Sequence, residues 1–213
     1  MKKPYNHLLG RTVRVDLSEQ LVHLTRGTLQ EAETAFRSIV GERQLRGSSN
    51  GVRGGHKVVC FSEAPIDVLA KLFSSTAHDF RYRPFGVMVP KAWLFDHGGR
   101  PVIYQPEQDF ELLPNELQHR HVRFDRPGGE KDFTFEREWR VATNALQLDP
   151  RVCTLIVPDR QWDYKLRGEH DEKDMRKAAA LRMNPFTRIS AFEWHILALG
   201  DLGARFPLND DAP

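Results

Sequence analysis

Apolar and polar residues alternate along several short stretches of this chain and recur at helical spacing along others. The alternation predicts strands at 21–27, 57–61, 85–89, 102–104, 122–124, 133–141 and 152–157. Helical spacing predicts helices over 28–40, 62–73 and 172–183, with an apolar closing element at 189–199. Thr28 and Ser62 are the expected N-caps of the first two helices. Strands and helices interleaved in this way predict an α+β fold.

The longest alternating stretch, residues 132–141, sorts apolar and polar side chains onto opposite faces of one strand. The apolar face carries Phe133, Phe135, Trp139 and Val141. The polar face carries Thr134, Glu136, Glu138 and Arg140. Two carboxylates beside a guanidinium are costly to bury unless they form ion pairs or serve in catalysis. The pattern therefore favours either a solvated face, on which the charges neutralise each other, or a catalytic face. On an exposed face, truncation of Glu138 would cost about 0.5 kcal/mol or less.

A histidine and a threonine share one face of the strand at 21–27. Val22 and Leu24 are expected to point to the core, with His23 and Thr25 pointing the other way. Such a pair is more often a hydrogen-bonded structural contact than a binding site. A helix follows directly, and after it comes a glycine-rich, basic loop at 46–55.

The order of the segments resembles a known family. The matching motifs are His23-Leu24-Thr25, Val59-Cys60-Phe61-Ser62-Glu63-Ala64-Pro65, Phe85-Gly86-Val87, Gly98-Gly99-Arg100-Pro101-Val102-Ile103-Tyr104 and Glu136-Arg137-Glu138-Trp139-Arg140. Together they are similar to bacterial AbiGi-type abortive-infection proteins and, more distantly, to DarT-like ADP-ribosyltransferases, which modify nucleic acids. The resemblance implies an ADP-ribosyltransferase-like core, in which peripheral helices surround a split mixed or antiparallel β-sheet.

The resemblance also implies roles for individual residues. It makes NAD a co-substrate and Glu138 the catalytic carboxylate, with Glu136 as the alternative. The residues expected to contact NAD are His23, Thr25, Arg26, Arg53, Ser62 and Tyr104. The residues expected to contact nucleic acid are Arg46, Lys57, Arg120 and Arg123. Glu63 stands where the DarT pattern has an arginine, so the cation for the pyrophosphate is expected from Arg26, Arg46, Arg53 or Arg100.

Composition limits these expectations without deciding them. The chain has 213 residues, enough for one sizeable core, which we expect over 21–200 between an N-terminal extension at 1–20 and a flexible tail at 201–213. A net charge of +2 does not by itself indicate a nucleic-acid binder, although basic residues gather at 43–57 and 119–126. The nine histidines and two cysteines lack metal-ligand spacing, so no metal is expected. We identify neither a signal peptide nor a long apolar run, and we therefore expect a cytoplasmic protein without membrane contact.

The function expected from these features is that of a toxin-like effector in anti-phage abortive infection. It would transfer ADP-ribose from NAD to RNA or single-stranded DNA, under the control of an antitoxin or chaperone. Two alternatives stay open. One is an inactive module of the same fold that senses a nucleotide or a phage component, or serves as an antitoxin. The other is an NAD-dependent RNA 2′-phosphotransferase. That class relies on arginines and histidines, so the presence of Glu136 and Glu138 argues against it.

Overall fold

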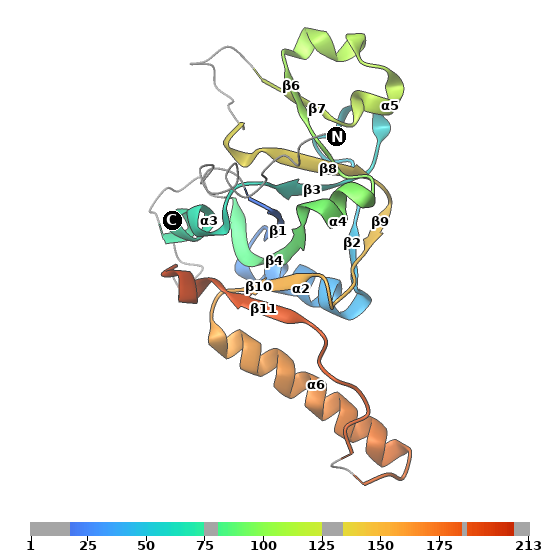
Figure 1. The fold of residues 1–213 in the computed structure, drawn as a ribbon, viewed down its shortest axis with the longest axis vertical. Coiled ribbons are helices and arrows are strands. Elements are labelled where there is room, and N and C mark those ends of the chain that lie inside the picture. The colour runs from blue at the N-terminus through green and yellow to red at the C-terminus, as the bar shows by residue number, and fades with distance from the viewer. Residues whose placement is uncertain (1–17, 75–80, 125–133, 185–186, 207–213) are drawn as a thin grey trace, which may run out of the picture. The chain divides into compact units, whose positions relative to one another are not determined.

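The computed structural model describes residues 18–74, 81–124, 134–184 and 187–206 (Figure 1). The chain forms two compact units. The first comprises residues 1–23, 44–69 and 88–147, and the second comprises 24–43, 70–87 and 148–213. Most of the expected N-terminal extension and tail lies outside the described residues.

The first unit contains most of the short strands. Its elements are β2 (Gln44–Arg46), η1 (Arg53–Gly55), β3 (Val58–Ser62), α4 (Lys91–Asp96), β5 (Arg100–Pro101), β6 (Ile103–Gln105), η2 (Glu107–Leu112), α5 (Asn115–Gln118), β7 (His121–Arg123), η3 (Thr134–Glu136), β8 (Glu138–Ala142) and β9 (Ala145–Gln147). The second unit contains α2 (Leu29–Glu42), β10 (Thr154–Val157), α6 (Arg160–Ala180), β11 (His195–Ala198) and η4 (Leu199–Leu202). Three elements contribute residues to both units: β1 (Gln20–Arg26), α3 (Ile66–Ser74) and β4 (Tyr82–Pro90).

Seven of the described strands belong to one sheet, in the hydrogen-bonded order β11-β10-β4-β1-β3-β8-β5. The strands β1, β3, β8 and β5 pair antiparallel, whereas β10 and β11 pair parallel. Two smaller sheets join β2 to β9 and β6 to β7. The prediction of an α+β fold is therefore confirmed.

The core of the first unit forms where β3 lies against β8, as Figure 1 shows. Phe61 opposes Trp139 and Val59 opposes Val141, and all four side chains are buried. Opposed residues point to the same face of a sheet, so these pairs make one continuous apolar row. The strand β8 begins only at Glu138, because residues 134–136 form η3 instead of continuing the predicted strand.

The second unit is built around aromatic rings. Phe36 of α2 lies 5.3 Å from Phe85, and Trp162 of α6 lies 4.8 Å from Phe85, measured between ring centroids. Thr28 caps α2 through the predicted capping box, in which its hydroxyl accepts from the Glu31 amide.

Two expectations for the C-terminal elements were wrong. The helix predicted over 172–183 begins at Arg160, where the Asp159 carboxylate accepts from the Gln161 and Trp162 amides. Within the segment expected to be an apolar closing element, 189–199, His195 is exposed, while its neighbour Trp194 is buried.

Candidate functional site

Ser62 and Glu138 lie opposite each other at the end of the β3–β8 pair, and they form the centre of the candidate site. Two residues further along the pair, Cys60 opposes Arg140. All four side chains point to the same face, because opposed residues and residues two apart share a face. Ser62 does not cap a helix as predicted: its hydroxyl accepts from the Ala64 amide, and α3 begins at Ile66.

Glu138 is held by two neighbours rather than exposed to solvent. Its carboxylate is 14% exposed and forms a two-point ion pair with Arg140, with Nε–Oε1 at 2.9 Å and Nη2–Oε2 at 3.4 Å. Its main-chain N–H donates to the Tyr104 hydroxyl at 3.0 Å. The expectation that this position is exposed was therefore wrong.

Arg140 is the most deeply buried cation of the site, with 7% of its side chain exposed. Its Nη1 donates to the main-chain oxygens of His119 at 2.8 Å and His121 at 3.1 Å. Burial by itself favours the neutral guanidine, but the Glu138 carboxylate outweighs it and raises the pKa of Arg140. Arg140 thus stays charged and fixes the carboxylate in one orientation.

Tyr104 is expected to contact NAD, and the structure places its hydroxyl on the Glu138 backbone. Burial raises the pKa of Tyr104 to about 12, so the phenol stays protonated across the physiological range. The neutral Tyr104 hydroxyl accepts from the main-chain N–H of Glu138 and so stabilises the first residue of β8.

Glu136 does not continue the alternation that leads to Glu138. Arg137, between them, has a left-handed backbone with φ 45°, and Glu136 lies buried in η3. The main-chain oxygen of Glu136 accepts from the Ser62 hydroxyl at 2.7 Å. This turn also leaves Phe135 55% exposed, so its predicted place on the apolar face was wrong, and Phe133 lies outside the described residues.

Glu63 is a buried carboxylate with two side-chain partners. Its Oε1 lies 2.5 Å from Lys91 Nζ, and its Oε2 accepts from Trp139 Nε1 at 2.8 Å. Neither Lys91 nor this use of Trp139 was foreseen. No local pattern connects a turn after β3 with the first residue of α4.

His23 and Thr25 each form a hydrogen bond with the main chain of a neighbouring strand. His23 Nδ1 lies 2.8 Å from the Cys60 carbonyl, so this nitrogen carries the proton and donates. In the second unit, the buried Thr25 hydroxyl donates to the Phe85 carbonyl at 3.0 Å. These contacts fit the structural role that such a pair was also expected to have.

The register of β1 gives His23 a different face from Glu138. Val22, not His23, opposes Ser62. The His23 ring lies edge-on to Phe61, with centroids 5.7 Å apart, in the row that continues to Trp139. The sheet therefore brings the strands of His23, Ser62 and Glu138 next to one another, but it does not align His23 and Glu138 on one face.

The arginines expected to bind pyrophosphate already have partners among the described residues. Arg26 donates to the Tyr82 hydroxyl. Arg53 pairs with Glu107 at 2.6 Å and stacks on Phe110 at 3.7 Å. Arg100 donates to the Phe95 and Gly99 carbonyls and stacks on the Phe95 ring. Arg46 is exposed on β2.

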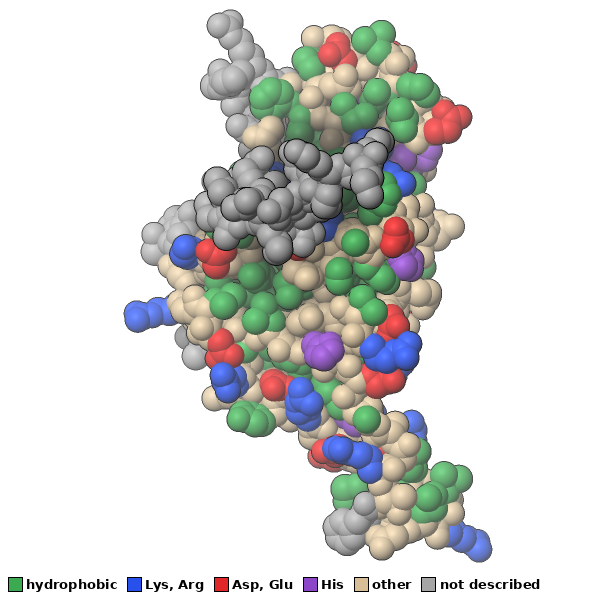
Figure 2. Space-filling model, viewed as in Figure 1, with side chains coloured by type: hydrophobic (Ala, Val, Ile, Leu, Met, Phe, Trp, Pro, Cys, Tyr) green, Lys and Arg blue, Asp and Glu red, His purple; other side chains and the backbone are tan. Residues whose placement is uncertain are grey.

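The residues expected to contact nucleic acid are spread over several elements. Lys57 and Arg123 are exposed, whereas Arg120 donates to the Pro101 carbonyl at 2.9 Å. Burial, with a contribution from Arg100, lowers the pKa of Arg120. Positive and negative side chains are interspersed on the face drawn in Figure 2, so no patch of a single sign stands out there. The two basic runs do meet at one point, where the His56 and His119 rings lie 5.6 Å apart.

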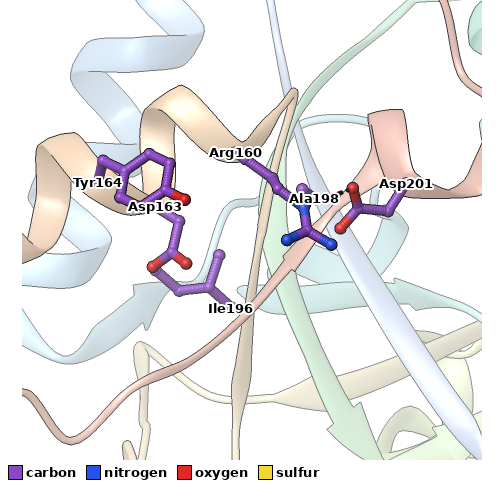
Figure 3. Close-up of a pocket in the computed structure, with 6 residues that line it drawn as sticks. All are labelled: Arg160, Asp163, Tyr164, Ile196, Ala198 and Asp201. Carbon is purple, nitrogen blue, oxygen red and sulfur yellow. Dashed lines mark hydrogen bonds and ion pairs between the residues drawn. The ribbon is translucent and has the colours of Figure 1, made fainter.

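A cavity of about 240 Å³ lies in the second unit (Figure 3). Its lining residues are Arg160, Asp163, Tyr164, Ile196, Ala198 and Asp201. Arg160 Nε and Asp201 Oδ1 form an ion pair at 2.9 Å on one side of it. None of the site residues predicted from the sequence lines this cavity.

Within the described ranges, no three side chains of His, Cys, Asp and Glu are placed to hold a metal ion. The described helices include none that is both long and apolar enough to cross a membrane. The chain matches no protein-family model, no curated protein and no solved structure.

Proposed function

We propose that this protein is an NAD-dependent ADP-ribosyltransferase that modifies a base of RNA or single-stranded DNA, as a toxin-like effector controlled by an antitoxin or chaperone. One observation carries the proposal. The strands that hold His23, Ser62 and Glu138 come from distant parts of the chain and are consecutive in the sheet, as β1, β3 and β8. A split sheet of the ADP-ribosyltransferase type is the fold that this order supports.

Glu138 meets the main chemical demand of the reaction. Cleavage of the bond between nicotinamide and ribose passes through a cation-like ribosyl centre, which a fixed carboxylate stabilises electrostatically. By analogy with single preorganised groups in other enzymes, such a carboxylate would contribute about 3–4 kcal/mol. Arg140 and Tyr104 supply the preorganisation, because they hold the Glu138 side chain and main chain respectively. Glu136 is the alternative carboxylate.

His23 and Ser62 would contribute to binding the co-substrate. His23 Nδ1 donates to the Cys60 carbonyl, which fixes the orientation of the ring, and the ring would position the adenosine portion of NAD. Ser62 opposes Glu138 and would contact the ribose at the reacting centre. The acceptor base must leave any stack to reach this centre, which favours a single strand, and Arg46, Lys57 and Arg123 are exposed cations suited to phosphates.

A second candidate is a catalytically inactive module of the same fold that binds a nucleotide. The ion pair of Glu138 with Arg140 favours it, because a neutralised carboxylate stabilises a cation-like centre less than a free one. Binding of NAD without any transfer would support this candidate over the enzyme.

Labelled NAD tests the proposal directly. The protein is incubated with labelled NAD and, separately, with total RNA, single-stranded DNA and cell lysate, and the labelled fraction is identified. We expect label on nucleic acid, and none with Glu138→Gln, whose NAD affinity in calorimetric titration should be close to that of the wild type. His23→Ala should instead weaken NAD binding. If the wild type shows no NAD binding and no transfer, the proposal is refuted. If label appears on protein alone, the nucleic-acid acceptor is refuted.

A further inference from the structure

We infer that Glu63 is a positioning residue for Glu138, because it holds the chain immediately before and immediately after that carboxylate. The inference rests on the proposed transferase function and adds a residue to its machinery. Glu63 occupies the position at which the DarT pattern has an arginine. Its charge is opposite, and its side chain contacts other residues of this chain.

The first set of contacts holds the chain before Glu138. The Glu63 main-chain N–H is shared between the carbonyls of Glu136, at 3.1 Å, and Arg137, at 3.3 Å. The neighbouring Ser62 hydroxyl donates to the same Glu136 carbonyl at 2.7 Å. These bonds fix the left-handed turn at Arg137, with φ 45°, from which β8 starts.

The second set holds the chain after Glu138. The Glu63 carboxylate, 11% exposed, accepts from the indole N–H of Trp139 at 2.8 Å while Lys91 Nζ lies 2.5 Å from its other oxygen. A buried carboxylate that lost either partner would be left incompletely satisfied, so the side chain of Trp139 has one favoured orientation. Lys91 neutralises the charge that would otherwise oppose burial.

Glu63 acts through these contacts and not on the reacting atoms. Adjacent strand residues point to opposite faces, so Trp139 and the carboxylate bound to it lie on the face opposite to Glu138. Residues 136, 137 and 139 are each bonded to Glu63, and residue 138 is opposed by Ser62. The backbone of Glu138 is therefore fixed on either side, which sets the direction of its carboxylate.

Two substitutions remove the contacts one at a time. Glu63→Gln keeps an acceptor for Trp139 and removes the negative charge that pairs with Lys91, whereas Trp139→Phe keeps the ring and removes the N–H. In each variant the turnover number for ADP-ribose transfer should fall about 10- to 100-fold, because small displacements of a catalytic group have effects of this size. The dissociation constant for NAD, measured by calorimetry, should stay unchanged, since ground-state contacts are not touched.

The control is Glu169→Gln, which removes a carboxylate from the two-point ion pair with Arg37 in the second unit. All proteins are assayed well below their measured melting temperatures, so that a loss of stability alone does not lower turnover. If both variants keep wild-type turnover, or if they lose NAD affinity instead, the positioning role is refuted while the transferase stands. If the wild type itself transfers nothing, the proposed function fails and the positioning role fails with it. If Glu63→Gln does not fold, Trp139→Phe decides between these results.

Discussion

Truncation of Glu138 should destabilise this protein far more than removal of a surface carboxylate. Glu138→Ala takes away the carboxylate that pairs with Arg140, and only 7% of the Arg140 side chain is exposed. The guanidinium is also held in place by its hydrogen bonds to the His119 and His121 carbonyls. It would remain buried with its charge uncompensated.

The contacts that Arg140 keeps set the magnitude. Loss of one partner from a buried ion pair costs about 3–5 kcal/mol. Arg140 retains its hydrogen bonds to the His119 and His121 carbonyls, so the lower end, about 3 kcal/mol, is expected. For a chain of this size each kcal/mol lowers the melting temperature by about 2–4 °C, which gives a decrease of roughly 6–12 °C.

Urea and thermal denaturation, followed by circular dichroism, measure this loss. Glu172→Ala is the matched control, because Glu172 pairs with Arg176 on α6 and both side chains are more than two-thirds exposed. That change should cost about 0.5 kcal/mol or less. A loss below about 1 kcal/mol in Glu138→Ala would refute the reasoning, since a buried, uncompensated guanidinium costs more than that. For activity tests, Glu138→Gln is the better variant because its amide oxygen can still accept from Arg140.

Three further outcomes are expected. In a spectroscopic titration, Tyr104 should ionise near pH 12, because burial raises its pKa from 10.0. Its contribution to stability is then complete below pH 10 and is lost as the pH rises toward 12, and in Tyr104→Phe that dependence should disappear. Arg137→Val should lower the melting temperature more than Arg137→Gly does, since both lose the same side chain but only the β-branched residue opposes φ 45°. Asp174 accepts from the Ser190 amide and hydroxyl and from the Ile189 amide, which lower its pKa below 3.8. Stability should therefore fall with pH below about 4 in the wild type, and fall less in Asp174→Asn.

Features encoded within a few residues were predictable from the sequence. The capping box of Thr28 and Glu31 forms as expected, because both partners lie in the same turn of chain. The α+β class and the strand around Phe85 follow from short-range alternation in the same way. The burial of Trp194 agrees with its place in an apolar segment.

Local rules failed wherever a distant partner decided the outcome. Residues 133–141 alternate well enough to predict one strand. Glu136 is nevertheless turned out of it, because the Ser62 hydroxyl and the Glu63 amide bind its carbonyl from β3. The long helix α6 escaped prediction over its first half because most of its residues are polar, so its apolar periodicity is weak.

For the candidate site, the sequence by itself determined the residue types and their order, including His23, Ser62 and Glu138. Tertiary structure decided their neighbours. The pairing of β1, β3 and β8, the burial of Arg140 against Glu138, and the contacts of Glu63 with Lys91 and Trp139 all join segments far apart in the chain. Such contacts depend on which strands pair and in which register. Register follows from the packing of whole faces and not from any one segment, so a single strand's pattern does not contain it.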